Sequence, residues 1–279
     1  MEKFVTLNNG VKMPRLGFGV YQIDDLAQAQ QVVEDGLEIG YRLVDTAQIY
    51  GNEQAVGDAI KHSIVPREDI FVTSKIWVDD YGYDKTLEAF DESMKKLQLD
   101  YLDLYLIHKP YNDYYGTWRA LERLYKEEGR IRAIGVSSFW NERLADLITF
   151  NDVKPVVNQI ETNVWNQEWK SQKYMEKEGV QPEAWAPFAE GADHVFTNPV
   201  LEEIAEKHHK TTAQVMLRWF LQRNYVVIPK SVHKERLAQN FDVFDFELDK
   251  TDMEKIKTLD QGRSILEDEM NPEIAESFR

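Results

Sequence analysis

Four polar residues capable of proton transfer are spaced regularly in the first half of the chain: Asp45, Tyr50, Lys75 and His108. Asp45, Lys75 and His108 each end a short apolar run, and Tyr50 lies in the loop after the first run. The intervals between these three run ends are 30 and 33 residues, about one strand-and-helix unit each. If the runs are neighbouring parallel strands, the four side chains meet at one rim. There they could donate a proton and stabilise charge that develops on oxygen.

The segments around these residues alternate short β-branched runs with longer helical patterns. About eight strands can be counted from LGFGV (16–20) to VVIPK (226–230). Nearly continuous apolar strands are typical of parallel sheets buried on both faces, and eight right-handed crossovers would close a barrel. We therefore predict a single α/β domain over residues 1–279, a (β/α)8 TIM barrel.

An open, doubly wound sheet is the alternative fold. The glycines of LGFGV do not form GxGxxG, and the chain has no GxxxxGK[ST] loop. A nucleotide would have to bind in another way.

Three further segments carry structural signals. FVTLNNGVKM (4–13) centres on Asn9-Gly10, a pair typical of a type I′ turn, and predicts an N-terminal β-hairpin. VLEEIAEKHHKTTAQVMLRWFLQ (200–222) is helical in pattern throughout, and SILEDEMNPEIAESFR (264–279) is expected to form a C-terminal loop or tail.

Composition argues against several classes of function. The net charge of -16 argues against nucleic-acid binding, which needs a Lys/Arg-rich face. No apolar run approaches the ~20 residues that cross a bilayer. The chain has no cysteine, which excludes disulfides and cysteine-bound metals, and its start lacks the features of a signal peptide. We expect a soluble, cytoplasmic protein.

The segment GYRLVDTAQIYGNEQAVG (40–57) resembles the signature of the aldo-keto reductase family. The segments LYLIHKP, RAIGVSSFW, PVVNQIETN and VVIPKSVHKERLAQN follow in the family's order, so the resemblance covers essentially the whole chain. The chain looks most similar to bacterial members related to 2,5-diketo-D-gluconic acid reductases and methylglyoxal reductases. The resemblance implies a monomer that uses NADPH to reduce aldehydes or ketones to alcohols.

The resemblance also implies roles for the four spaced residues. Tyr50 would donate the proton, and Lys75 would lower the pKa of its phenol from ~10. Asp45 would keep Lys75 charged and oriented, and His108 would hydrogen-bond to the substrate's carbonyl oxygen. Taken singly, an aspartate at a strand end is most often a helix cap or an ion pair, and a tyrosine a core residue.

Two further segments would hold the cofactor if the resemblance holds. The 2′-phosphate of NADPH would lie against Lys230, Ser231 and Arg236, and the carboxamide of the nicotinamide against Ser137, Ser138 and Gln159, with Trp185 stacked on the ring. Val232, His233, Gln239 and Asn240 complete the adenosine segment. Ser138 replaces a usual Asn and Gln239 a usual Glu. The alternative is that the basic residues here form a solvated helix face.

The substrate pocket implied by the resemblance is apolar and aromatic. Its expected lining is Val20, Tyr21, Trp77, His108 and Trp165. Lys109 replaces a Trp found in many relatives; it either favours acidic substrates or points into solvent.

Two other functions remain open. The first is a regulatory module that binds the cofactor with little turnover. The presence of all four residues of the implied tetrad, Asp45, Tyr50, Lys75 and His108, argues against it. The second is a metal-assisted hydrolase or isomerase. The six histidines, including the adjacent His208 and His209, show no converging ligand set, so we predict no metal.

Overall fold

The computed structural model describes residues 2–266 and 271–278. Within them, eight parallel strands form one sheet in chain order from β3 to β10. The strands are β3 (Phe18–Gly19), β4 (Leu43–Asp45), β5 (Phe71–Ile76), β6 (Leu104–Ile107), β7 (Ile134–Ser137), β8 (Val157–Glu161), β9 (Gln181–Trp185) and β10 (Val226–Val227).

The sheet closes on itself beside β3. Leu16 and Val227 form a parallel bridge, and the Gly17 amide donates to the Val227 carbonyl at 3.0 Å. The predicted barrel is therefore confirmed, and the open sheet is excluded.

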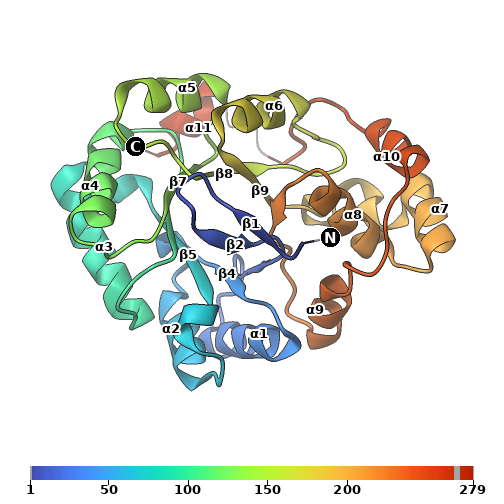
Figure 1. Ribbon diagram of the computed structural model, residues 1–279, viewed down its shortest axis with the longest axis horizontal. Helices are drawn as coiled ribbons and strands as arrows, with labels where there is room; N and C mark the ends of the chain where they lie inside the picture. Colours follow the sequence, from blue (N-terminus) through green and yellow to red (C-terminus); the bar gives the residue numbers. More distant parts are fainter. Residues whose placement is uncertain (1, 267–270, 279) are drawn as a thin grey trace.

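Helices surround the strands in Figure 1. They are α1 (Leu26–Ile39), α2 (Glu53–His62), α3 (Tyr83–Leu97), α4 (Tyr114–Lys126), α5 (Asn141–Phe150), α6 (Trp169–Glu178), α7 (Pro199–His208), α8 (Thr212–Gln222), α9 (Lys234–Phe241), α10 (Lys250–Lys257) and α11 (Pro272–Glu276). Among the described residues, no helix is long and apolar enough to span a membrane.

Helix α1 shows how the sequence directs the chain into a functional strand. Asp25 caps its start by accepting from the Gln28 amide at 3.0 Å, and its apolar face is buried. The helix ends at Gly40, whose φ of 122° is open to glycine but strained for other residues. The chain turns there and enters β4, which carries Asp45.

The helical pattern over 200–222 forms two helices, α7 and α8, with a break between them. α7 ends at His208, His209 adopts a left-handed φ of 53°, and Thr211 starts α8 with a capping box to Gln214. Thr211 followed three residues later by Gln214 is a signal for a helix start. The apolar periodicity continues across it and gives no sign of the break.

The N-terminal hairpin is present, with β1 (Phe4–Thr6) antiparallel to β2 (Lys12–Pro14). Its turn is not type I′, because Gly10 has a positive φ (87°) and Asn9 does not. The Gly10 amide donates to the Leu7 carbonyl at 2.9 Å, as in a type I turn followed by a left-handed glycine.

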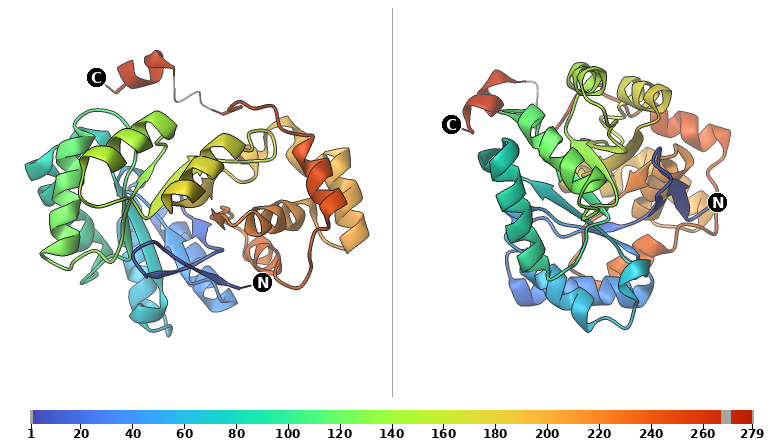
Figure 2. Two further views of the ribbon diagram at one scale, coloured as in Figure 1. Left: turned by 45° about the horizontal axis from the view of Figure 1, so that its top comes forward. Right: turned by 60° about the vertical axis from the view of Figure 1, so that its left-hand side comes forward.

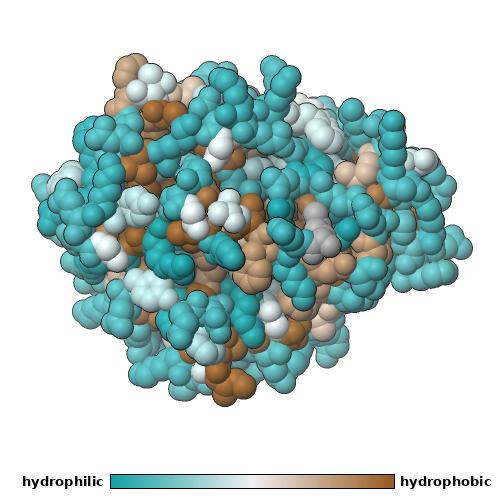
Figure 3. All heavy atoms as spheres, in the orientation of Figure 1, coloured by the Kyte–Doolittle hydropathy of each residue, from teal (hydrophilic) through white to brown (hydrophobic). Residues whose placement is uncertain are grey.

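The hairpin lies over one end of the barrel and appears in front of the strands in Figure 1. Asn8 ties it to that end by donating to the carbonyls of Pro155 (2.9 Å) and Gly179 (3.0 Å). Figure 3 shows that this face is mostly hydrophilic. The carboxyl ends of the strands lie at the opposite end.

The last helix, α11, lies outside the ring of helices that surrounds the barrel. Figure 2 shows α11 on the side of α4 and α5. Beyond α11, the Phe278 ring packs on Trp77 and Tyr111, at centroid distances of 5.5 and 5.4 Å. The predicted tail thus reaches an aromatic residue expected in the pocket; its residues 267–270 and 279 lie outside the described range.

Candidate active site

The four spaced residues meet at the carboxyl end of the barrel. Asp45 is the last residue of β4, Lys75 lies near the end of β5, and His108 directly follows β6. Tyr50 ends a short 3-10 helix (Gln48–Tyr50), after which Gly51 turns the chain with a φ of 70°. Strand register sets this convergence, because Lys75 pairs with Leu106 and Asp45 with Thr73.

Lys75 is at the centre of the cluster and is completely buried. Its ammonium lies 2.5 Å from Asp45 Oδ1, 3.0 Å from the Thr46 carbonyl and 3.4 Å from the Tyr50 hydroxyl. These partners account for its three N–H groups. Burial alone would lower the pKa of Lys75, but Asp45 and Tyr50 outweigh it, so the pKa rises and Lys75 stays charged.

The pKa of Tyr50 differs from the expectation. Lys75 does lower it, but burial of the hydroxyl has the larger effect and raises the pKa of Tyr50 to about 12. The phenol therefore holds its proton at neutral pH in the protein alone. The sequence shows the lysine but not how deeply the hydroxyl is buried. The expectation that Lys75 would lower the pKa of Tyr50 below its usual value was therefore wrong.

His108 is a neutral imidazole. Burial, then the charges of Lys75 and Lys109, hold its pKa well below the usual range. Its ring packs edge-on against Trp77 and Tyr50, with centroids 5.0 and 5.7 Å away. Nδ1 is buried without a hydrogen-bond partner in the described part of the chain. Since a neutral imidazole donates from one nitrogen, His108 can give one hydrogen bond to an oxygen next to Tyr50.

Gln159 on β8 is fixed beneath this cluster. Its Nε2 donates to Asp45 Oδ2 at 3.0 Å and to Glu183 Oε2 at 3.1 Å, which uses both of its N–H groups. The side-chain oxygen remains available to accept from a carboxamide.

The other residues expected around a nicotinamide lie close by. Ser137 ends β7 in register with Gln159, and the Ser138 amide donates to the Gln159 carbonyl at 2.8 Å. Ser138 has a left-handed φ of 61°, and both serines are buried. Trp185 ends β9 and is partly exposed.

The basic segment after β10 has its cations at the surface. Lys230 and Arg236 are exposed, and no ion pair within the described ranges involves either. Lys234 is instead paired with Glu38 at 2.6 Å and Asp35 at 3.0 Å. Ser231 is buried and accepts from the His233 amide at the start of α9, where free helix amides favour an anion. Val232 is partly buried, His233 and Gln239 are exposed, and Asn240 is buried.

The chain is similar to known proteins over nearly its whole length. The profile of the Aldo/keto reductase family matches residues 15–261. This chain belongs to that family. It is 48% identical over 262 residues to the glyoxal reductase of Bacillus subtilis (strain 168), which covers 94% of each protein. It is 42% identical over 264 residues to the methylglyoxal reductase DkgA of Escherichia coli (strain K12), again 94% of each. A Bombyx mori aldo-keto reductase solved in complex with NADP superposes with a TM-score of 0.88 at 33% identity, covering 95% of each chain.

In this aldo-keto reductase, aromatic rings line the approach to Tyr50. Tyr21 is 49% exposed and lies 4.9 Å from the Tyr50 ring, and Trp77 packs on His108. Trp165 is nearly buried. Val20 has no exposed surface, so its side chain does not face an opening.

Lys109 does not simply point into solvent. The Tyr81 hydroxyl holds its backbone on both sides, accepting from its amide at 2.9 Å and donating to its carbonyl at 3.0 Å. Its ammonium lies 6.0 Å from the centre of the Trp185 ring. The substitution thus places a positive charge at the rim of the site.

The structure adds one residue that the sequence analysis missed. Glu183 on β9 is completely buried, and burial followed by the charge of Asp45 raises its pKa to about 8. The only signal in the sequence is a glutamate inside the strand QPEAW. Within the described ranges, no cluster of three or more His, Asp or Glu side chains could hold a metal ion.

Proposed function

We propose that this protein uses NADPH to reduce aldehydes or ketones, such as small dicarbonyls, aldehydes and keto-sugars, to alcohols, with Tyr50 as general acid. The observation that carries the proposal is the buried Asp45–Lys75 pair within 3.4 Å of the Tyr50 hydroxyl. The naming of relatives as glyoxal and methylglyoxal reductases supports the substrate class.

The reaction needs one hydride and one proton. When bound, the reduced nicotinamide supplies the hydride to the carbonyl carbon. Tyr50 gives its proton to the carbonyl oxygen, and Lys75 stabilises the phenolate that remains. His108 donates a hydrogen bond to the same oxygen and orients the substrate, so the product is the alcohol.

The cofactor would extend between two groups of residues. Gln159 Oε1, Ser137 and Ser138 would hold the carboxamide, with Trp185 against the ring. Lys230, Ser231 and Arg236 would hold the 2′-phosphate, because exposed cations without protein partners can pair with it. Val232, His233, Gln239 and Asn240 would surround the adenosine.

Tyr21, Trp77 and His108 would contact the substrate, with Val20 behind them. We also propose that the enzyme acts as a monomer in a bacterial cytoplasm, which size-exclusion chromatography and localisation in the source cell would test.

Tyr50→Phe tests the central role. We expect the variant to lose at least about a hundredfold in kcat, because general acid catalysis contributes that much, and to keep its affinity for NADPH. NADPH oxidation should be followed by absorbance against glyoxal, methylglyoxal, an aromatic aldehyde and a keto-sugar.

Tyr174→Phe on the outer helix α6 is the matched control, and its turnover should equal that of the wild type. If Tyr50→Phe lost NADPH binding instead of turnover, Tyr50 would be structural. Tight NADPH binding by the wild type with no turnover of any carbonyl would favour a cofactor-binding regulatory module.

A further inference from the structure

A second carboxyl group lies beneath the tetrad. Glu183 is reached from Asp45 through one side chain, since Gln159 Nε2 donates to one oxygen of each. Asp45 in turn holds Lys75 at 2.5 Å. The other oxygen of Glu183, Oε1, is buried without a hydrogen-bond partner in the described part of the chain.

The charges in this enclosure do not balance if both carboxyls ionise. Lys75 is the cation that acts on Glu183, and Asp45 is the anion. Gln159 is neutral, and Val226, which pairs with Glu183 from β10, is apolar. A second buried anion with one unsatisfied oxygen is costly, so Glu183 favours its neutral form. The pKa shift described above has the same direction.

We propose that Glu183 is a positioning residue that sets the charge around the Asp45–Lys75 pair and, through it, the readiness of Tyr50 to release its proton. With Glu183 neutral, Lys75 has one carboxylate partner and its charge acts on the Tyr50 hydroxyl. With Glu183 ionised, a second negative charge offsets Lys75, and Tyr50 holds its proton more firmly. The proposal rests on the function proposed above.

A purely structural role makes a different prediction. If Glu183 only holds Gln159 in place, replacing it with glutamine preserves an acceptor for Gln159 and leaves the pH dependence of the reaction unchanged. The pH profile therefore separates the two roles.

The test compares Glu183→Gln with the wild type from about pH 6 to about pH 9. We expect the wild-type kcat for reduction to fall in the upper part of this range as Glu183 ionises, and the variant to lack this fall. At about pH 9, the fraction of the maximal kcat that remains should be about tenfold larger for the variant than for the wild type. This factor is expected because a carboxyl group whose pKa lies about one unit below the pH is only about one-tenth protonated. Superimposable profiles would overturn the proposal.

Glu53→Gln is the matched control. Glu53 on α2 is also buried with a raised pKa, and it accepts from Ser74, the neighbour of Lys75 that points to the opposite face of β5. The pH profile of Glu53→Gln should match that of the wild type; an equal change in both variants would also overturn the proposal.

Glu183→Asp keeps a titrating carboxyl and should retain the fall in kcat. A Glu183→Asp profile without the fall would overturn the proposal even if Glu183→Gln does not fold.

A second readout does not depend on turnover. Because the pKa of Glu183 is raised in the folded state, its contribution favours folding at low pH and is lost as pH rises through the folded pKa. The free energy of unfolding of the wild type should therefore fall more steeply than that of Glu183→Gln between about pH 5 and about pH 8. Equal slopes of the free energy of unfolding against pH in the two proteins would overturn the proposal. If the slopes differ but the wild type turns over no carbonyl, the result would count against the reductase function alone.

Discussion

Tyr50 would supply the proton in the proposed reaction, but in the protein alone its hydroxyl holds that proton tightly. Burial raises the pKa of Tyr50, and Lys75 opposes this by its charge and by its hydrogen bond to the hydroxyl. Sequence reasoning brought these four residues together because Asp45, Lys75 and His108 lie at strand ends and Tyr50 lies in the loop after the first of those strands. It could not find Glu183, because nothing local in the sequence shows that Gln159, 24 positions away, joins this glutamate to Asp45.

Arg236 is the residue on which the choice of cofactor should depend. We expect Arg236→Ala to weaken NADPH binding by about tenfold to a hundredfold, since a hydrogen bond to a charged group contributes roughly 1.5–3 kcal/mol. NADH lacks the 2′-phosphate, so its affinity should hardly change. Titration of both cofactors by quenching of tryptophan fluorescence measures this.

Lys234→Ala supplies the comparison on the same helix, because Lys234 is already paired with Glu38 and Asp35. It should affect NADPH much less. Equal weakening of NADPH and NADH by Arg236→Ala would contradict the assignment of the 2′-phosphate site.

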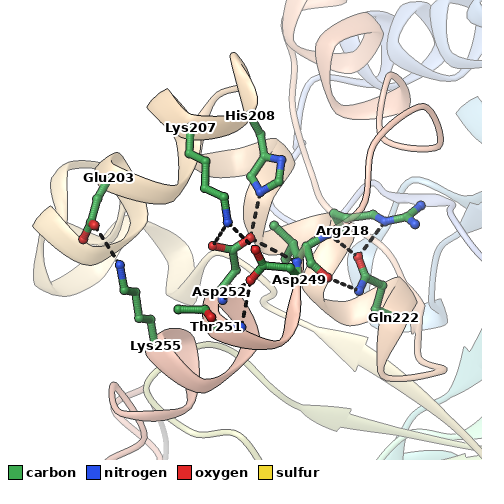
Figure 4. A network of polar contacts seen from close by, with 10 residues as sticks. Glu203, Lys207, His208, Arg218, Gln222, Asp249, Thr251, Asp252 and Lys255 are labelled. Atoms are coloured by element: carbon green, nitrogen blue, oxygen red, sulfur yellow. Dashed lines mark hydrogen bonds and ion pairs between the residues drawn. The ribbon is translucent and has the colours of Figure 1, made fainter.

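At the scale of elements, one buried carboxylate, Asp252, lies at the centre of the polar contacts that join α7 and α10 in Figure 4. Asp252 accepts from Lys207 at 2.8 Å, lies 2.7 Å from His208 Nε2, and closes the capping box of α10 through the Asp249 amide. Hydrophobic periodicity predicted a helix here but not its break after His208. The break follows from capping at Thr211 and the turn at His209, which let α7 present Lys207 and His208 to α10.

Asp252→Asn should destabilise the protein by about 1–3 kcal/mol at neutral pH, because Asp252 is paired with the charged Lys207 and its side chain is only 2% exposed. Burial alone would raise the pKa of Asp252, but bonds from Lys207 and His208 lower it overall. Its stabilisation is therefore present above the unfolded pKa of about 3.9 and lost as pH falls through the folded value. Urea unfolding should show a constant gap from the wild type above about pH 5, which closes below about pH 4.

Glu203→Gln breaks an ion pair between the same two helices, but its side chain is 65% exposed, so a change below about 1 kcal/mol is expected. A gap for Asp252→Asn as small as that, or one that widens in acid, would show that Asp252 does not hold the junction.

Over the whole molecule, we expect the carboxyl end of the barrel to carry the chemistry and the amino end to contribute to stability. The strand count, the parallel order and the end that carries the site were all predictable, because apolar runs and strand-end polar residues report on them locally. The type of the hairpin turn and the effect of burial on the pKa of Tyr50 could not be predicted. Both depend on the residues that surround them in the folded barrel. The tetrad gathers at the carboxyl end, whereas the hairpin closes the amino end.

Asn8→Ala tests this separation. Asn8 joins the hairpin to the barrel through two hydrogen bonds to the Pro155 and Gly179 carbonyls. Their loss should cost about 1–2 kcal/mol and lower the melting temperature by roughly 2–8 °C, while kcat/KM stays within about twofold of the wild type. Tyr50→Phe should do the reverse, losing activity with little change in melting temperature. If Asn8→Ala instead lowered kcat/KM with its melting temperature unchanged, the amino end would be coupled to the chemistry and the division between the two ends would not hold.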